Sequence, residues 1–330
     1  MTHKQWQAFV ATRPEANFLQ SWQWGELHEL LGDTVVRSFV YDGDTIVGGW
    51  QGIVKNARRG RYLEVPGGPL INWDDTAQVT AVTNQLRATA KEHNCVFVRI
   101  RAELHDAPQY RATLTQAGFT KAPFHLHAEH TNVLDLGPSE EGLLSVMRRQ
   151  TRYEVRRGLK KDITVSWSST PEAIDEFFAV QTDTAQRQGF IPPSQKFLRA
   201  QQQAFGDALR VYRAELDGVL LNLALVIHYG EEADYHEAAS TPESRSQPGA
   251  YALQWQAIRD AKAAGKARYN FWGIAYSDDP KHRYAGVTTF KRGFGGNDVT
   301  YVPAHDLIID QLRYPKNWLI ETIRRKRRNL

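Results

Sequence analysis

The segment VVRSFVYDGDTIVGGWQGIV, Val35–Val54, decides the fold of this chain. Two runs rich in valine, isoleucine and aromatic residues flank Asp42-Gly43, a pair that is typical of a tight β-hairpin. A second such segment, LRVYRAELDGVLLNLALVIHYG, has Asp217-Gly218 at its centre, 175 residues later (217 − 42). The sequence therefore predicts the same hairpin twice, which indicates an internal repeat.

The segments after the two hairpins also correspond. A helix-like stretch, TAQVTAVTNQLRATAKEHN, and a strand, CVFVRIRA, follow the first hairpin, while YALQWQAIRDAKAAGK and ARYNFWGIA follow the second. A short helical stretch then leads to Gly118-Phe119 in one copy and to Gly293-Phe294 in the other, again 175 residues apart (293 − 118). Strands that alternate with helices, but are joined partly by hairpins, predict an α/β fold with mixed sheets and helices on both faces.

A chain of 330 residues is long enough for two domains. The copies separate near LDLGPSEEGLL, Leu134–Leu144, where a Gly-Pro pair ends a strand and Ser139 can cap the next helix. The apolar positions after Pro303 suggest a strand and a helix that return to the first domain. We expect a first domain formed by residues 1–137 and 304–330, and a second formed by residues 138–303.

The composition is that of a globular protein, with 42% hydrophobic and 24% charged residues. No apolar run of about 18 residues is present, so we expect no membrane-spanning helix. The N-terminal stretch lacks the apolar core of a signal peptide. The single cysteine, Cys95, cannot form an internal disulfide, which fits a reducing cytoplasm, and we expect it to be a buried thiol.

The net charge is only +4, but two segments concentrate cations. They are MRRQTRYEVRRGLKK, Met147–Lys161, and the C-terminal RRKRRNL, Arg324–Leu330. Both could attract RNA, phosphorylated substrates or anionic lipid. The alternatives are a solvated helix face for the first segment and a frayed tail for the second.

The motifs of several enzyme classes are absent from the sequence. There is no CxxC, HExxH, GxSxG or phosphate-binding loop. His125 and His127 alternate in HLHAEH and would share one face of a strand, but no third ligand can be placed, so we expect no metal. The absence of an obvious nucleophile favours direct transfer between two bound substrates over a covalent enzyme intermediate.

Two cations suit a direct transfer. Such a reaction requires close positioning of the substrates and neutralisation of the charge on a tetrahedral intermediate. Lys291, in TTFKRGFGG (Thr288–Gly296), suits the neutralising role. Arg187, in TDTAQRQGF, suits a phosphate grip because a guanidinium binds phosphate in a bidentate manner. The alternative for each is an ordinary surface cation.

Several segments together resemble the FemABX family of peptidoglycan-bridge aminoacyltransferases. They are TRYEVRRGLKKDITV, TAQRQGF, AYALQWQAIRDAKAAGKARYNFWGI, TTFKRGFGG, FLQSWQWGEL and RGRYLEVPGGPL. The resemblance implies two tandem GNAT-like acyltransferase domains. The coiled-coil arm of some members is not expected, because no sustained heptads occur between Pro171 and Ala214.

The resemblance also implies a reaction. An amino acid would pass from aminoacyl-tRNA, the co-substrate, to the stem-peptide amine of a UDP-linked or lipid-linked muropeptide precursor in cell wall biogenesis, which maintains cell shape. The expectations that accompany it are a cytoplasmic monomer without a cofactor. The basic tail would provide any peripheral contact with the inner membrane face.

The resemblance assigns roles to particular residues. Lys291 would stabilise the oxyanion next to the ester, and Phe290 would shape that channel. Arg187 would grip the diphosphate of the precursor. Tyr235 and Tyr251 would border the substrate.

Two further residues belong to the first copy of the repeat. Trp24 matches the N-terminal tryptophan of the family, but the lysine that follows it in compact members is missing here, so His28 or Lys55 would have to replace that phosphate contact, or the grip is weaker. Asp106 is a candidate to orient or deprotonate the attacking amine. The leaving tRNA could take the proton instead, and an activated ester could react with orientation and oxyanion stabilisation alone.

Two alternatives stay open on the sequence. The first is an acetyl-CoA-dependent GNAT N-acetyltransferase, although the glycine-rich pyrophosphate loop of that fold is reduced here to Gly249-Ala250. The second is a non-catalytic basic RNA-binding protein, which explains the cationic segments but requires no particular role for Lys291.

Overall fold

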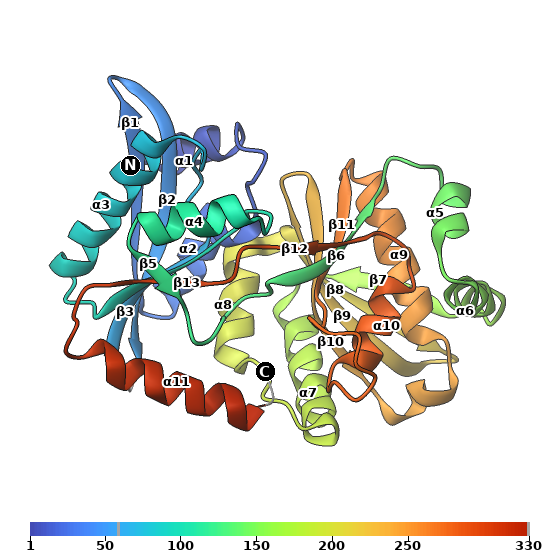
Figure 1. The fold of residues 1–330 in the computed structure, drawn as a ribbon. Helices are drawn as coiled ribbons and strands as arrows, with labels where there is room; N and C mark the ends of the chain where they lie inside the picture. The colour runs from blue at the N-terminus through green and yellow to red at the C-terminus, as the bar shows by residue number, and fades with distance from the viewer. Residues whose placement is uncertain (58–59, 329–330) are drawn as a thin grey trace. The chain divides into compact units, whose positions relative to one another are not determined.

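The structure is a computed structural model that describes residues 1–57 and 60–328 (Figure 1). The chain folds into two compact units, Met1–Glu129 with Thr300–Leu330, and His130–Val299. Each unit contains one mixed sheet with helices packed against it. Among the described residues, no helix combines the length and the apolar character needed to cross a bilayer.

The sheet of the first unit has the order β1-β2-β3-β4-β13-β5. The pair β3 and β4 is parallel, and the other neighbours are antiparallel. The strands are β1 (Thr34–Asp42), β2 (Thr45–Ala57), β3 (Gly60–Gly67), β4 (Phe97–Ala102), β5 (Phe119–Lys121) and β13 (His305–Ile308). The helices are α1 (His3–Val10), η1 (Phe18–Gln20), α2 (Trp22–Leu30), α3 (Thr76–Glu92), α4 (Pro108–Gln116) and α11 (Tyr314–Arg328).

The sheet of the second unit has the order β12-β6-β11-β10-β9-β8-β7, with β10 and β11 parallel. Its strands are β6 (His130–Asp135), β7 (Thr164–Ser168), β8 (Leu209–Leu216), β9 (Val219–Tyr229), β10 (Glu232–Ser240), β11 (Arg268–Gly273) and β12 (Asn297–Thr300). Its helices are α5 (Glu140–Val146), α6 (Arg149–Lys160), α7 (Pro171–Gln188), α8 (Gln195–Phe205), η2 (Gly206–Ala208), η3 (Pro242–Ser246), α9 (Gly249–Ala263) and α10 (Ala285–Arg292).

The repeat predicted from the two hairpins is present, with one local correction. Leu216 pairs with Val219, so Asp217-Gly218 forms a two-residue turn, and both residues have positive φ, 52° and 78°. In the first hairpin Asp42 pairs with Thr45, so the turn is Gly43-Asp44 and not the predicted Asp42-Gly43. Gly43 takes the left-handed conformation there, with φ 56°, and this glycine requirement fixes the register one residue later than expected.

The last strand of each repeat lies in the other sheet. Strand β6 follows β5 in sequence but pairs with β11 in the second sheet, while β13 follows β12 but lies between β4 and β5 in the first. The expected domains, residues 1–137 with 304–330 and residues 138–303, differ from the observed units by residues 130–137, which include β6, and by residues 300–303. Main-chain pairing, and not the Gly-Pro break, assigns β6 to the second unit. Ser139 does cap α5, accepting a hydrogen bond from the Gly142 amide.

Each sheet is covered by an amphipathic helix. In α3 the buried residues Val79, Val82, Leu86 and Ala90 recur at helical spacing and join the first core. In the second unit α9 contributes Trp255 and its neighbours to the other core. Cys95 is buried in the first core as expected, and burial raises the pKa of its thiol to about 11, so it is an inert packing residue.

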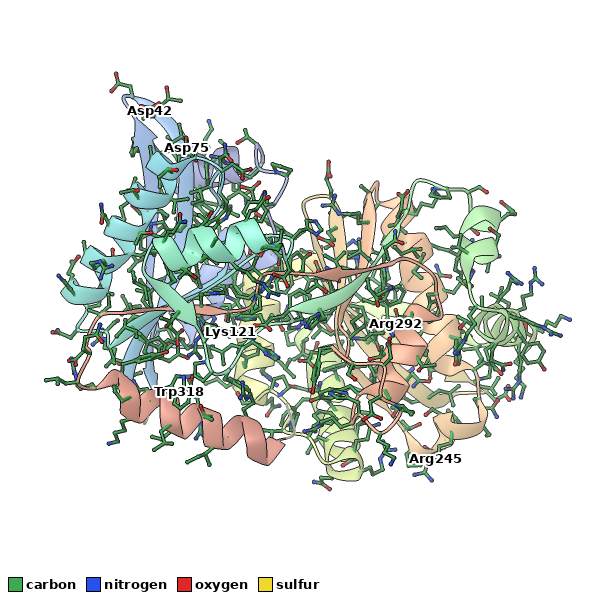
Figure 2. All side chains as sticks on the ribbon, in the orientation of Figure 1. Asp42, Asp75, Lys121, Arg245, Arg292 and Trp318 are labelled. Carbon is green, nitrogen blue, oxygen red and sulfur yellow. The ribbon has the colours of Figure 1, made fainter. Side chains whose placement is uncertain are left out.

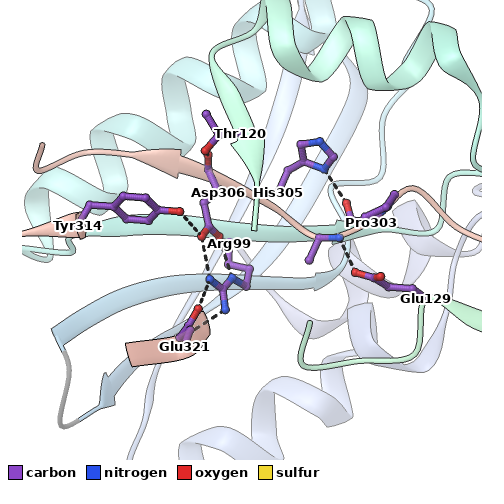
Figure 3. Close-up of polar contacts among 9 residues, drawn as sticks. Arg99, Thr120, Glu129, Pro303, His305, Asp306, Tyr314 and Glu321 are labelled. Carbon is purple, nitrogen blue, oxygen red and sulfur yellow. Dashed lines mark hydrogen bonds and ion pairs between the residues drawn. The ribbon is translucent and has the colours of Figure 1, made fainter. Parts of the chain in front are cut away.

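A buried ionic cluster fixes the C-terminal segment to the first unit (Figure 3). Arg99 on β4 binds both carboxylate oxygens of Asp306 on β13 at 2.7 Å and reaches Glu321 on α11 at 2.7 Å. The Tyr314 hydroxyl donates to Asp306 at 2.8 Å. The tail after Pro303 thus forms a strand and a helix held by charge as well as by packing. Asn329 and Leu330 of the basic tail lie outside the described residues.

Candidate active site

Lys291 lies near the C-terminal end of α10 and points into the second unit. Its side chain is buried, with 8% relative exposure. The Nζ atom donates a 2.7 Å hydrogen bond to the carbonyl oxygen of Gly273 and lies 5.5 Å from the ring centroid of Tyr235. The alternative reading of Lys291 as an exposed surface cation is therefore excluded.

The carbonyl of Gly273 comes from an irregular strand end. The register of β11 against β6 shifts between Asn270 and Gly273, and Trp272 adopts a positive φ of 59°. The Asn270 side chain supports this bend by accepting a 2.8 Å hydrogen bond from the Trp272 amide. Non-glycine residues with positive φ are uncommon and occur often at functional sites.

Lys291 is coupled to a carboxylate that the sequence did not reveal. Burial lowers the pKa of Lys291 to about 7, and the charge of Glu237 opposes this shift. Burial raises the pKa of Glu237 to about 7, while its hydrogen bond with Gln181 and the charge of Lys291 oppose that shift. Gln181 Nε2 donates to Glu237 Oε2 at 2.8 Å. A buried ammonium with one carboxylate nearby can change protonation state near neutral pH.

The strand β10 places Tyr235 and Glu237 together. A bulge falls between them, because Tyr235 pairs with Val226 and Glu237 pairs with the adjacent Leu225. Bulges re-aim side chains and are common next to active sites. The strand also carries Glu232, Asp234 and His236, so nothing in its sequence distinguishes Glu237 from the other polar residues.

An aromatic cluster lies next to Lys291. The Phe290 ring packs edge-on against Tyr251 with centroids 5.1 Å apart and against Phe294 with centroids 5.2 Å apart. Phe294 in turn stacks on Phe271 at 5.3 Å. The structure therefore brings together Lys291, Phe290, Tyr235 and Tyr251, four of the residues predicted for the site.

Arg187 contacts the end of β10, the strand that carries Tyr235 and Glu237. It is exposed at the end of α7, and its guanidinium donates to the carbonyl oxygen of Ser240, the last residue of β10, and to the Thr184 hydroxyl at 3.2 Å. These backbone and hydroxyl acceptors hold the guanidinium without neutralising its charge. Arg187 therefore remains suited to an anionic ligand.

Trp24 and Asp106 lie in the first unit, whereas Lys291 lies in the second. Trp24 is buried, with its ring edge-on to Phe18 at 5.5 Å and to His127 at 6.0 Å. Asp106 binds Arg111 through both carboxylate oxygens. A carboxylate in such a pair favours its charged form and is a weak base, which argues against deprotonation of an amine by Asp106.

The two substitutes considered for the missing lysine are engaged by one carboxylate. Asp33 Oδ2 lies 2.8 Å from His28 Nδ1 and 2.5 Å from Lys55 Nζ. Burial and the Lys55 charge lower the pKa of His28, although Asp33 opposes that shift. The charge available to a phosphate from this group is therefore smaller than the two cations suggest.

The histidines of HLHAEH do not form a metal centre in the described residues. His127 Nε2 lies 2.9 Å from Glu64 Oε1, and His125 Nδ1 lies 3.7 Å from Glu129 Oε2. Within residues 1–57 and 60–328, no group of three or more His, Cys, Asp or Glu residues is placed to hold a metal ion. Each of these histidines faces a single carboxylate instead.

Comparisons with known proteins agree with this fold. The sequence matches the FemAB family over residues 1–219 and 217–322. The UDP-N-acetylmuramoylpentapeptide-lysine N(6)-alanyltransferase of Weissella viridescens is 24% identical over 65% of this chain and 67% of its own length. The lipid II:glycine glycyltransferase of Staphylococcus aureus is 19% identical, with 98% of this chain and 95% of that protein covered.

Solved structures show the same architecture. The crystal structure of FemX superposes with a TM-score of 0.87 at 18% identity and covers 97% of this chain and 98% of that one. A tandem GNAT protein from the clavulanic acid biosynthesis pathway gives a TM-score of 0.53 at 13% identity over 84% of this chain and 83% of that one. The predicted mixed α/β fold of two GNAT-like halves is confirmed.

Proposed function

The chain belongs to the FemAB family, and from this premise we propose that it is an aminoacyltransferase that builds the interpeptide bridge of peptidoglycan. The amino acid would come from aminoacyl-tRNA and pass to the stem-peptide amine of a muropeptide precursor. The observation that carries the proposal is the buried Lys291, held by the Gly273 carbonyl at 2.7 Å beside the Tyr235 ring.

The proposed step is an attack by a neutral amine on the ester carbonyl. The new C–N bond forms, the carbonyl oxygen becomes an oxyanion, and the bond to the ribose oxygen of the tRNA then breaks. The amine proton passes to that leaving oxygen. Lys291, as an ammonium, donates to the oxyanion, and a buried donor is worth more there than in water.

The other residues of the second unit have supporting roles in this proposal. Phe290 and Tyr251, which pack edge-on, form a wall next to the ester, and Tyr235 lies under the Lys291 ammonium. Arg187 binds the diphosphate of the precursor. The names of the two relatives, which refer to a UDP-linked muropeptide and to lipid II, support a phosphate-bearing acceptor.

The residues of the first unit have a smaller role, in the binding of the acceptor. We assign Trp24 to lining the substrate site and Asp106 to orienting the amine, since the Arg111 pair makes Asp106 a poor base. The reaction then needs no general base, because the ester is activated and the leaving oxygen takes the proton. The protein acts as a cytoplasmic monomer without a cofactor.

Acetyl-CoA is a poor alternative donor. Gly249 could mark a remnant of the pyrophosphate loop, but close packing already explains why a glycine is present. A Cβ there would lie 2.5 Å from Asn222 Oδ1 and 2.8 Å from Leu221 Cβ. The glycine is thus needed where α9 starts against β9, with no ligand required. We expect no acetyl transfer to the precursor.

The function is tested by product analysis. The purified chain is incubated with a tRNA pool charged with isotope-labelled amino acids and with the UDP-linked or the lipid-linked precursor, and the products are read by mass. The proposal expects a precursor that gains one or more amino acids only when charged tRNA is present. Precursor modified by acetyl-CoA, or unmodified under every condition, would contradict it.

A further inference from the structure

The helix α6 presents a stripe of cations interrupted by one aromatic ring. Arg149, Tyr153, Arg156 and Lys160 follow one another at spacings of four, three and four residues, which places them on a single face of a helix. All four side chains are exposed, Tyr153 by 59%. We call these four residues the basic stripe.

The opposite face of α6 is buried and fixes the stripe toward solvent. Thr151, Val155 and Gly158 are the buried residues of the helix. A Cβ at Gly158 would lie 2.9 Å from the Cβ of Ala252 on α9, so the two helices pack closely at this point. Figure 2 shows nitrogen-tipped side chains that project outward from α6.

Among the described residues, no ion pair neutralises a cation of the basic stripe, although Glu141 lines the same hollow as Arg156. Glu154 is the one acid within the helix, and it pairs with Arg157 at 3.0 Å. Arg152 is used inside the fold, where its guanidinium donates to the Leu144 and Ser145 carbonyl oxygens at 3.3 and 3.1 Å. The cations of the stripe therefore remain available for a ligand with repeated negative charge.

The stripe begins next to the candidate active site. The amide of Arg148 donates a 2.9 Å hydrogen bond to the carbonyl oxygen of Gly293, two residues after Lys291. A Cβ at Gly293 would lie 2.3 Å from Thr151 Oγ1, so the first turn of α6 is in close contact with the end of α10. The charge of Arg148 also acts on the Tyr251 hydroxyl. A ligand that reaches Lys291 can continue along α6.

We propose that the basic stripe of α6 binds the phosphate backbone of the RNA that carries the amino acid. The inference rests on the proposed function for the identity of the donor. With its ester at Lys291, the RNA would run along α6, where three cations contact phosphates and Tyr153 stacks on an unpaired base near the 3′ end. Cation contacts with stacking aromatics are the usual means by which proteins bind single-stranded RNA.

RNA fits the stripe better than a membrane surface does. A helix that lies in a membrane interface needs an apolar face beside its cations. Beside the cations, α6 exposes one tyrosine and a single aliphatic side chain, Leu159, which is too little for a continuous apolar face. From Arg149 to Lys160 the stripe is about 16 Å long, eleven steps of 1.5 Å, and spans several consecutive phosphates.

The test compares two triple variants of the full chain. Arg149→Glu, Arg156→Glu and Lys160→Glu reverse the stripe, and Lys4→Glu, Lys91→Glu and Lys196→Glu make the same charge change at exposed lysines elsewhere. Fluorescence anisotropy measures binding of labelled deacylated tRNA between 50 and about 300 mM salt. The stripe variant should bind about a hundredfold more weakly near 150 mM, with a salt slope lower by about two to three. The control variant should match the wild type.

Two further variants separate charge from stacking and protect the test from misfolding. Arg149→Gln, Arg156→Gln and Lys160→Gln should give a smaller loss of affinity in the same direction. Tyr153→Ala should weaken binding about tenfold with an unchanged salt slope. Thermal unfolding checks that each variant is folded.

The outcomes distinguish this inference from the proposed function. Loss of tRNA binding in the stripe variant, with no aminoacyl transfer by the wild type, would support the inference and contradict the function. Normal tRNA binding and an unchanged KM for charged tRNA in the stripe variant would overturn the inference while transfer stands. Stripe-dependent binding to vesicles of anionic phospholipid without binding to tRNA would also overturn it.

Discussion

The Nζ atom of Lys291 lies 2.7 Å from the carbonyl oxygen of Gly273, inside the second unit and not at its surface. One backbone acceptor occupies only one of the three donor positions of an ammonium. The remaining donors can serve a second acceptor that arrives with the substrate. This relationship is the basis of the oxyanion role that we propose for Lys291.

The pH dependence of the reaction should report Lys291. Burial lowers its pKa to about 7, so the ammonium form, and with it the rate, declines as the pH rises through and above 7. Glu237 opposes the lowering, so Glu237→Gln should lower the pKa of Lys291 further and move the falling limb to lower pH. The rate at pH 8 should fall several-fold. The exposed Glu243→Gln is the control, and a limb that stays in place in Glu237→Gln would disprove the coupling.

Arg187 should affect precursor binding more than turnover. Arg187→Ala removes a charge-assisted phosphate contact, so KM for the precursor should rise about tenfold to a hundredfold with little change in kcat. Arg187→Lys should restore only part of the affinity because it loses the bidentate geometry. Arg245→Ala, at another exposed arginine of the same unit, serves as the control (Figure 2). A loss of kcat alone in Arg187→Ala would refute the assignment.

The contact between Gly293 and Thr151 should be visible as energetic coupling. Gly293→Ala forces a Cβ to within 2.3 Å of Thr151 Oγ1 and should cost about 1–3 kcal/mol in the free energy of unfolding. Thr151→Ala removes the obstructing oxygen, so the double variant should be more stable than the sum of the two single changes predicts. Denaturant unfolding of the four proteins measures this interaction. Strict additivity would show that the two helices do not meet as described.

The buried cluster around Arg99 should be worth far more than a surface pair. Arg99→Met leaves the carboxylates of Asp306 and Glu321 buried without a cation and should cost about 3–5 kcal/mol. Arg111→Ala breaks the pair with Asp106, where the arginine side chain is 57% exposed, and should cost less than about 1 kcal/mol. Urea unfolding compares the two. Equal costs would mean that the C-terminal segment is not held by this cluster.

Local sequence patterns predicted the strands and helices but not all of their partners. The paired hairpins and Gly-Phe positions identified the repeat because turn chemistry and periodicity act over a few residues. Of the exchange of β6 and β13 between the sheets, the sequence predicted the place of β13 but not that of β6. These strands are six and four residues long, so tertiary pairing decides which sheet they join. The return of the tail was visible, and the departure of β6 was not.

In the candidate site too, some residues were predicted from local motifs and others became evident only in the structure. The TTFKRGFGG motif pointed to Lys291 and Phe290, and the structure adds that the Lys291 side chain is buried. Glu237 could not be predicted, since its effect on Lys291 depends on the bulge in β10 and on the hydrogen bond from Gln181. Asp106 was plausible as a base from its position in the sequence, but its pairing with Arg111 becomes evident only in three dimensions.

The most direct measurement compares Lys291→Met with the wild type in single-turnover transfer from charged tRNA to the precursor. Loss of a buried oxyanion donor should lower the transfer rate by about 10²–10³, while the affinity for tRNA stays the same. Transfer at the wild-type rate in the folded Lys291→Met protein would show that the ammonium next to Gly273 has no part in the chemistry.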